Sequence, residues 1–383
     1  MEVRTYFGQY SLMHWIDLIL QKNIELPPYQ RYFVWSEEKA KLLIESLKNK
    51  QFIPPVTIGT FIENGHKKNY ILDGQQRLTS ILLSALGYFP DREKFKKVES
   101  TFRDEGDVPE EFYDNDIIEW KFSQLLSKDK NELDEIKEEL QNNEYFKKFE
   151  TQSNNFLYSH FLSFSFIILD SDDESEQQKY FASTFRNINY QGKALEPIES
   201  RDALYYMNAS WKPLFIPDIK FFKKEKIDFV RYISLLSQYY KKGKSTNGIA
   251  YGYSRKMELY YEHFIYNVID KTYTNLFGDF ETYIPQKELK KREQLLEENI
   301  SLINLNFGKN SSIIDLDLFL FGIINYSIFL NKKISKNNIE SIKNKILEES
   351  QKFKNDNAHA RTPSVLRFLY SRIEKSIEIF GEV

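Results

Sequence analysis

The spacing of apolar residues predicts alternating helices and strands over the first 90 residues of the chain. Residues 11–20 place apolar side chains at helical spacing. Ser36 precedes two glutamates and an apolar periodic stretch, which is typical of a helix N-terminus. The β-branched segment 54–63 and the segment 67–74 predict two strands joined by a turn, and residues 77–86 have the pattern of a helix.

The pattern changes three times in the rest of the chain. Residues 91–150 hold 19 acidic and 11 basic residues in a mostly helical pattern, which favours an inserted, exposed helical element with a solvated face. The apolar run 162–173 predicts a central strand, and 175–207 predicts a helix, a glycine loop and a second helix. We therefore expect an α+β domain over 1–207, with 91–150 as an acidic helical insertion, and an all-α domain over 208–383.

Composition restricts the functional classes. The 383 residues are 41% apolar, which is enough for two packed domains. The net charge of −3 gives no general attraction to nucleic acid or to anionic membranes. The absence of cysteine excludes disulfides, thiolate catalysis and cysteine-ligated metal sites. The N-terminus lacks the apolar core of a signal peptide, and no apolar run is long enough to span a membrane, so we expect a cytoplasmic protein.

The junction between the second predicted strand and the next helix is crowded with polar side chains: Asp73, Gln75, Gln76 and Arg77. A helix N-terminus presents unpaired N–H groups and the positive end of the helix dipole, and these bind anions such as phosphate. Arg77 adds a planar cation, and Gly74 lets a ligand approach the backbone. The glutamines can donate to phosphate or orient a water, and Asp73 can hold a metal or accept a proton. Alternatively, Asp73 only caps the helix and Arg77 is a surface charge.

Two further segments place polar groups beside turns. A rigid diproline is followed by Tyr29, Gln30 and Arg31. Tyr29 and Arg31 can stack on or clamp a nucleotide, and a plain surface loop is the alternative. Near the end of the 175–207 stretch, Asn189 and Lys193 stand on either side of Gly192 and can reach a phosphate or a base. A turn with an asparagine cap is the alternative there.

The order of these segments resembles a known family. The motifs L-P-P-Y-Q-R-x-x-V-W, I-P-P with a strand, I-L-D-G-Q-Q-R-L-T and F-x-x-I-N-x-x-G-x-x-L follow one another as in the domain of unknown function 262. The resemblance covers roughly residues 8–205 and implies a ParB/sulfiredoxin-like fold. It also implies a relation to type IV restriction enzymes and to sensors of phosphorothioate-modified DNA. Sulfiredoxin chemistry itself does not apply, because its nucleophile is a cysteine.

The D-G-Q-Q-R segment of that family is implicated in binding and hydrolysing nucleoside triphosphates. The resemblance therefore implies catalytic roles for Asp73, Gln75, Gln76 and Arg77. It implies nucleotide binding by Tyr29, Gln30, Arg31, Gly74, Thr79, Asn189, Gly192 and Lys193. Asp73 is the expected ligand of a Mg²⁺ ion that accompanies the triphosphate.

The helical region adds a basic segment. Between Lys220 and Lys256 there are ten basic and two acidic residues, with tyrosines interleaved. Such a segment can bind a nucleic-acid backbone, and the candidate residues are Lys241, Lys242, Lys244, Arg255 and Lys256. A solvated basic loop over a tyrosine-rich core is the alternative. Further along, the candidate contacts to a partner or to the first domain are Arg361, Arg367 and Arg372.

Many relatives carry a C-terminal HNH nuclease domain, but the five histidines of this chain are scattered. His359 beside Asp356 is the nearest candidate for an HNH residue, and no second histidine lies near it in the sequence. DNA cleavage by this chain is therefore not expected. The first hypothesis is a metal-dependent triphosphatase of an anti-phage or restriction-type system that couples nucleotide to DNA or to a separate nuclease or effector protein. The second is a nucleotide- or DNA-binding sensor without turnover, and the third is a ParB-like DNA nickase. The sequence is compatible with an oligomer.

Overall fold

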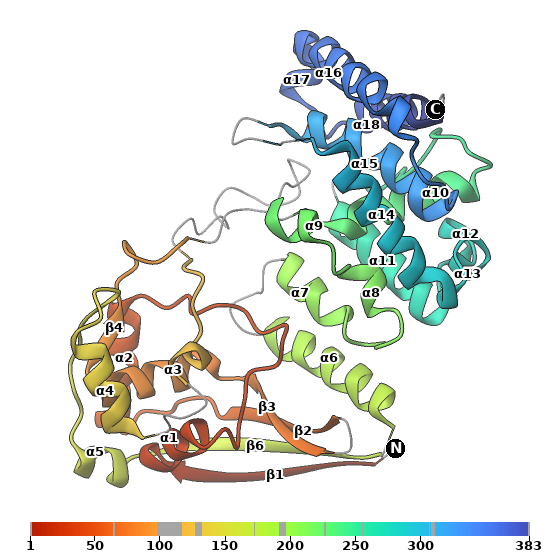
Figure 1. Ribbon diagram of the computed structural model, residues 1–383. Helices are drawn as coiled ribbons and strands as arrows, with labels where there is room; N and C mark the ends of the chain where they lie inside the picture. Colours follow the sequence, from red (N-terminus) through yellow and green to blue (C-terminus); the bar gives the residue numbers. More distant parts are fainter. Residues whose placement is uncertain are drawn as a thin grey trace. The chain divides into compact units, whose positions relative to one another are not determined.

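The chain forms two compact units (Figure 1). Among the described residues the first unit ends at Ala203 and the second begins at Leu204, whereas the sequence placed the boundary after residue 207. The first unit mixes helices with a small sheet and the second is helical, which confirms the coarse fold class. The computed structural model describes residues 2–63, 66–97, 117–126, 132–171, 173–190, 197–225, 227–254, 256–305, 307 and 311–381.

The first unit is built on a four-stranded sheet with the order β1-β6-β2-β3. Strands β2 and β6 pair in parallel, β1–β6 and β2–β3 pair antiparallel, and β4 pairs separately with β5. The elements of this unit are β1 (Glu2–Ser11), α1 (Leu12–Leu20), α2 (Glu37–Lys48), β2 (Val56–Glu63), β3 (His66–Asp73), α3 (Gln75–Leu86), β4 (Tyr88–Pro90), a 3₁₀ turn (Phe122–Leu125), α4 (Leu133–Gln141), β5 (Phe146–Lys148), α5 (Asn154–Ser159), β6 (Phe161–Asp170), α6 (Glu174–Tyr190) and α7 (Pro197–Leu204).

Helices cover both faces of the sheet (Figure 1). On one face the side chains of α1, α2 and α3 pack against Val56, Ile58 and Ile71. On the other face α6 lies along β2 and β3, with Phe181 fully buried against Phe61. The predicted central strand is confirmed as β6, which lies between β1 and β2. Its two faces carry apolar residues that belong to the two cores on either side of the sheet.

Two local predictions differ from the structure at the start of the chain. The helix over 11–20 is confirmed as α1, with the Ser11 hydroxyl accepting from the His14 N–H at 3.2 Å. However, strand β1 was not predicted. Its residues 2–7 are all exposed, so it lacks the alternation of apolar and polar positions that marks a half-buried strand. Similarly, α3 begins at Gln75 rather than at Arg77.

The segment 91–150 differs from the predicted exposed, mostly helical insertion. Among its described residues, one helix, one 3₁₀ turn and one short strand alternate with irregular backbone. Trp120 and Ile136 are 2% exposed and belong to the main core. The backbone N–H of Phe33 donates to the Trp120 carbonyl at 2.9 Å. Apolar residues of this segment therefore complete the core of the first unit.

The second unit is a bundle of helices, as the sequence predicted. No helix among the described ranges is long and apolar enough to cross a membrane. The elements are α8 (Lys212–Phe215), α9 (Lys220–Glu225), α10 (Phe229–Lys241), α11 (Met257–Asp270), α12 (Thr274–Phe277), α13 (Phe280–Tyr283), a 3₁₀ turn (Gln286–Glu288), α14 (Leu289–Ile303), α15 (Ile313–Ile324), a π-turn (Asn325–Phe329), a 3₁₀ turn (Lys336–Asn338), α16 (Ile339–Asn355), α17 (Asn357–Arg361) and α18 (Leu366–Gly381).

A buried carboxylate joins three helices of this bundle. Asp317 on α15 is fully buried and accepts two hydrogen bonds from Arg231 on α10, at 2.5 and 3.0 Å. It also accepts from Arg372 on α18 at 2.8 Å and from the Tyr232 hydroxyl at 3.1 Å. Removing one partner from such a network leaves a buried charge without compensation, so its members depend on one another.

His359 extends this network. Its Nε2 lies 2.8 Å from Nη1 of Arg372, and its ring lies between Phe353 and Phe368 at centroid distances of 4.5 Å. Burial, and then the charge of Arg372, lower the pKa of His359 to about 4, while Asp356 and Asp317 act in the opposite direction. The ring is therefore neutral at physiological pH and accepts the hydrogen bond from Arg372.

We predict that Asp317→Asn lowers the free energy of unfolding of the second unit by about 3–5 kcal/mol, because two buried guanidinium groups lose their counter-charge. Urea unfolding followed by circular dichroism measures this change. Glu298→Gln is the matched control, since the Glu298–Lys333 pair is 2.7 Å long but exposed on both sides. An Asp317→Asn protein as stable as this control would contradict the role given to the network.

The His359 pKa predicts a pH dependence. A histidine whose folded pKa is below its unfolded value of about 6.5 stabilises the fold above that pH, and the stability is lost as the pH falls toward 4. We expect His359→Gln, which keeps an acceptor for Arg372, to flatten this loss, so that its melting temperature falls by about 2–4 °C less than that of the wild type between pH 7 and 4.5. Differential scanning calorimetry measures the melting temperatures. If the melting temperatures of the wild type and of His359→Gln fall equally between pH 7 and 4.5, His359 is not the source of the pH dependence.

Candidate functional site

The candidate site lies where strand β3 ends and helix α3 begins. Gly74 is the N-cap of α3 and has φ +96°, a left-handed conformation that favours glycine. A Cβ atom at this position would lie 2.9 Å from Cγ2 of Val56 and 3.2 Å from Nη2 of Arg77. No side chain caps the helix. Glycine thus fits both the backbone and the space, and it leaves the N-terminus of α3 without an internal acceptor.

The two glutamines after Gly74 hold the loop 31–35 against the helix. Gln75 Nε2 donates to the Arg31 carbonyl at 3.0 Å. Gln76 Nε2 donates to the Tyr32 carbonyl at 3.0 Å, and Gln76 Oε1 accepts from the N–H of Val34 at 2.9 Å. Both side chains are buried, and Gln76 Nε2 also donates to Gln75 Oε1 at 3.2 Å. The glutamine amides, which the sequence assigned to phosphate or to a water, are engaged by the backbone of this loop.

Asp73 and Arg77 form an ion pair across the junction. Arg77 Nη2 donates to Asp73 Oδ2 at 2.5 Å and to the Pro55 carbonyl at 3.3 Å. The Arg77 side chain is 13% exposed and that of Asp73 is 35% exposed. Buried Nε of Arg77 has no hydrogen-bond partner among the described residues. Asp73 is the last residue of β3 rather than the helix cap, so the alternative in which it only caps α3 does not hold.

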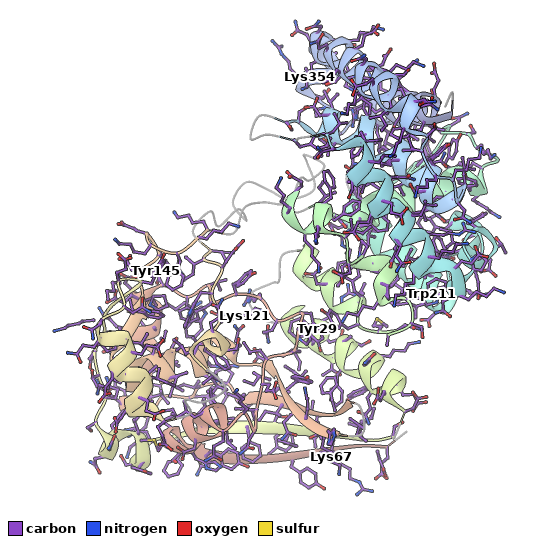
Figure 2. All side chains as sticks on the ribbon, viewed as in Figure 1. Tyr29, Lys67, Lys121, Tyr145, Trp211 and Lys354 are labelled. Carbon is purple, nitrogen blue, oxygen red and sulfur yellow. The ribbon has the colours of Figure 1, made fainter. Side chains whose placement is uncertain are left out.

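The Tyr29–Arg31 segment lies beside this junction. Gln30 is 6% exposed and donates from Nε2 to the Ile71 carbonyl at 3.1 Å, which fixes the segment to β3. Tyr29, which is labelled in Figure 2, packs edge-to-face on Phe185 of α6 with ring centroids 5.0 Å apart. Its ring therefore contributes to packing. Arg31 differs from both, because its partly exposed guanidinium makes no hydrogen bond or ion pair with any residue that the structure describes.

The third predicted segment is described only in part. Asn189 is in the last turn of α6, four residues after Phe185, so its backbone follows the turn that contacts Tyr29. Gly192 and Lys193 lie outside the described residues. Thr79 is fully buried, and its hydroxyl donates to the Gln75 carbonyl within α3 at 2.8 Å. The structure thus brings together the first two segments and the end of α6, and it turns Thr79 inward.

The sequence missed one residue that shapes the junction. The Pro55 carbonyl accepts from Arg77 and so helps to hold the guanidinium beside Asp73. Thr57, two residues later, stands opposite Asp73 in the β2–β3 pairing, next to a register shift. The I-P-P motif before β2 was the available signal, because its second proline ends the loop immediately ahead of the strand.

The junction offers limited metal-binding capacity. Within the described ranges no three acidic or histidine side chains gather to hold a metal ion. Asp73 Oδ2 receives Arg77, and Oδ1 accepts no hydrogen bond from a described residue. Because Mg²⁺ in nucleotide sites commonly takes one or two carboxylates together with phosphate oxygens, Asp73 fits a single contact to an ion brought with the triphosphate.

The basic surface of the second unit stays a prediction. Lys241, Lys242, Lys244 and Lys256 are exposed, and Arg255 lies outside the described residues. Tyr240 stacks on Phe329 at 4.5 Å, and its hydroxyl donates to Asn325. These contacts favour the alternative of a solvated basic loop over a tyrosine-rich core.

Two arginines were misassigned at the sequence level. Arg231 was counted with the basic segment and Arg372 with a partner-facing group, but both are buried on Asp317. His359, the nearest candidate for a nuclease residue, is 2% exposed and belongs to the same network. Sequence periodicity did not indicate that these arginines are buried, because charged residues are usually exposed and the partner that allows their burial is distant in sequence.

Comparison with known proteins supplies the family. The model of the GmrSD restriction endonuclease N-terminal domain matches residues 15–206, which is half of the chain and includes all three motif segments. No curated protein and no solved structure matches the chain. Because the match covers half of the chain and includes β2, β3, β6, the junction and α6, the chain belongs to the GmrSD restriction endonuclease N-terminal domain family.

Proposed function

We propose that the β3–α3 junction binds the phosphates of a nucleoside triphosphate and hydrolyses it, as part of a restriction-type anti-phage system. The family match supports the restriction-type role. The single observation that carries the nucleotide site is the N-terminus of α3 without a side-chain cap. Arg77 and Arg31 lie on adjoining segments, and the Arg31 guanidinium has no partner among the described residues. Helix N–H groups and arginine forks are the groups that proteins use for phosphate.

The buried glutamines position this site. Their amides fix the backbone of Arg31 and Tyr32 to the first turn of α3. The position of the Arg31 Cα atom, from which the guanidinium extends, is therefore defined. Burying a polar group without a hydrogen bond destabilises a fold by about 1–3 kcal/mol. Each buried glutamine is therefore stable only when the loop backbone supplies its hydrogen-bond partners. Gln75 and Gln76 therefore act through Arg31 rather than on the phosphate itself.

Hydrolysis requires that a water attack the γ-phosphorus while the bond to the bridging oxygen of the β-phosphate breaks. Asp73 Oδ1 accepts the proton that the water loses, and Asp73 Oδ2 stays on Arg77. Arg77 and Arg31 stabilise the charge on the transferred phosphoryl group. A Mg²⁺ ion bound with the triphosphate would add charge neutralisation at the phosphate oxygens.

A sensor without turnover is the second candidate function. The observation that favours it is the engagement of both glutamine amides by the loop, which leaves neither to orient a water. Binding alone would then be the signal, and a separate nuclease or effector protein would act on DNA. The exposed lysines after α10 are the proposed contacts of this chain with a nucleic acid.

One assay separates these functions. The purified protein is incubated with Mg²⁺ and each of the four ribonucleoside triphosphates, and released phosphate is measured beside calorimetric binding. Phosphate release supports the hydrolase, and binding without release supports the sensor. The absence of both binding and release would contradict the proposed site. A supercoiled plasmid in the same reactions tests the nickase hypothesis.

We predict that Asp73→Asn lowers the rate of phosphate release by at least about 100-fold, because the amide still accepts from Arg77 but cannot take a proton. The melting temperature and the affinity for triphosphate should change little. Asp134→Asn, an exposed carboxylate on α4 in the same unit, is the control and should keep full activity. Full activity of Asp73→Asn would remove Asp73 from the mechanism.

We predict that Arg31→Ala weakens triphosphate binding about 10-fold or more, because a charge-assisted contact to phosphate is lost. Its melting temperature should equal that of the wild type, since the guanidinium holds no described part of the fold together. Isothermal titration calorimetry gives the affinity, and the exposed Arg361→Ala serves as the control. Unchanged affinity in Arg31→Ala would argue against the second cationic contact.

A further inference from the structure

Strand β1 forms an open edge of the sheet. It spans ten residues and pairs only with β6 through its inner side, and no described strand pairs with its outer side. Each residue with an outward N–H and C=O offers an unsatisfied donor and acceptor to another strand. Proteins commonly protect such edges with proline or with charged side chains. Strand β1 contains no proline and no lysine, and its two charged residues, Glu2 and Arg4, are ion-paired with each other.

Three large apolar side chains are exposed on this edge, among the polar residues of the strand. Phe7 is 76% exposed, Tyr6 is 52% exposed and Val3 is 37% exposed. Val3 and Phe7 project from one face of the sheet, where they stand beside Leu169 and Ser165 of β6, and Tyr6 projects from the other. A free edge flanked by large exposed apolar groups is typical of a surface that another strand covers.

We propose that β1 pairs with β1 of a second copy of this chain, antiparallel and about a two-fold axis, so that the two sheets join into one of eight strands. A symmetric dimer needs a strand that is complementary to itself, because the same patch serves both partners. The sequence of β1 meets this requirement in one register.

The register is limited by the pleat and by exposure. Residues directly opposite each other in antiparallel strands share a face, so the two-fold axis passes through a pair of equivalent residues. The longest run of exposed residues is 2–7, and beyond it Gly8 and Tyr10 are partly covered while Gln9 is exposed. A two-fold at Thr5 pairs residues 2–8 with residues 8–2 of the second copy and uses this exposed stretch.

The side chains in this register match. Val3 faces Phe7 of the second copy twice, which joins the exposed apolar groups on one face. Arg4 faces Tyr6 twice on the other face, where a guanidinium can stack on the phenol ring. Thr5 faces its own copy. Seven residue pairs add about six to eight backbone hydrogen bonds.

The neighbouring registers are worse. A two-fold at Arg4 places two arginines opposite each other, and like charges on directly opposed residues are destabilising. A two-fold at Tyr6 places Val3 opposite Gln9 and leaves Arg4 opposite Gly8. A two-fold at Phe7 would use Tyr10 and Ser11, which are already engaged by Phe164 and by the start of α1.

The association is tested on the full chain by sedimentation velocity at several concentrations. We expect a dimer in the wild type and at least a tenfold higher dissociation constant for Phe7→Lys, because a charged lysine on an edge strand opposes pairing. Phe52→Lys is the matched control, since Phe52 is 88% exposed on the loop before β2, and this variant should dimerise like the wild type. A monomeric wild type, or a dimer indifferent to Phe7→Lys, would overturn the proposal.

The absence of cysteine makes the register directly measurable. Under mild oxidation Thr5→Cys should give a covalent dimer, because only that residue faces its own copy. Tyr6→Cys and Phe7→Cys should give little, since their partners across the axis are Arg4 and Val3. A disulfide formed by Tyr6→Cys or Phe7→Cys in preference to Thr5→Cys would overturn the register, whereas none of these outcomes depends on nucleotide binding.

Discussion

The first unit depends on the double glutamine clamp between α3 and the loop 31–35. Gln76 donates to one loop carbonyl and accepts from two loop N–H groups, while Gln75 donates to a second carbonyl. These side chains replace the strand or helix pairing that the loop backbone lacks. Because the same helix turn carries Arg77, the clamp also fixes the backbone of Arg31 relative to the backbone of Arg77. A polar motif at a strand–helix junction therefore has a structural explanation before any chemistry is considered.

The clamp connects elements that are distant in sequence. The N–H of Phe33 in the clamped loop donates to the Trp120 carbonyl of the acidic segment, and Gln30 fixes the preceding turn to β3. Tyr29 continues the contact to α6 through Phe185. The junction is thus supported by four separated parts of the chain, which is consistent with a site whose geometry must be held within a fraction of an ångström.

Much of the fold was predictable from the sequence, and the failures have physical causes. Periodicity and caps located α1, α2, β2, β3 and β6, because these elements bury one or both faces. Strand β1 escaped because its exposed side chains carry no burial pattern. In the acidic segment the charge run concealed Trp120, a core residue. The sequence assigned Thr79 and the two glutamines to a ligand. It does not show the direction of a side chain, and in the structure these side chains satisfy backbone groups.

The central claim is that triphosphate binds at the clamped junction. Hydrogen–deuterium exchange of the purified protein, with and without Mg²⁺ and triphosphate, tests it most directly because it reports each peptide separately. The account predicts slower exchange in peptides covering 29–35 and 73–79, with no change in the buried core of α15. Unchanged exchange in both junction peptides at saturating triphosphate, or protection confined to the second unit, would contradict it.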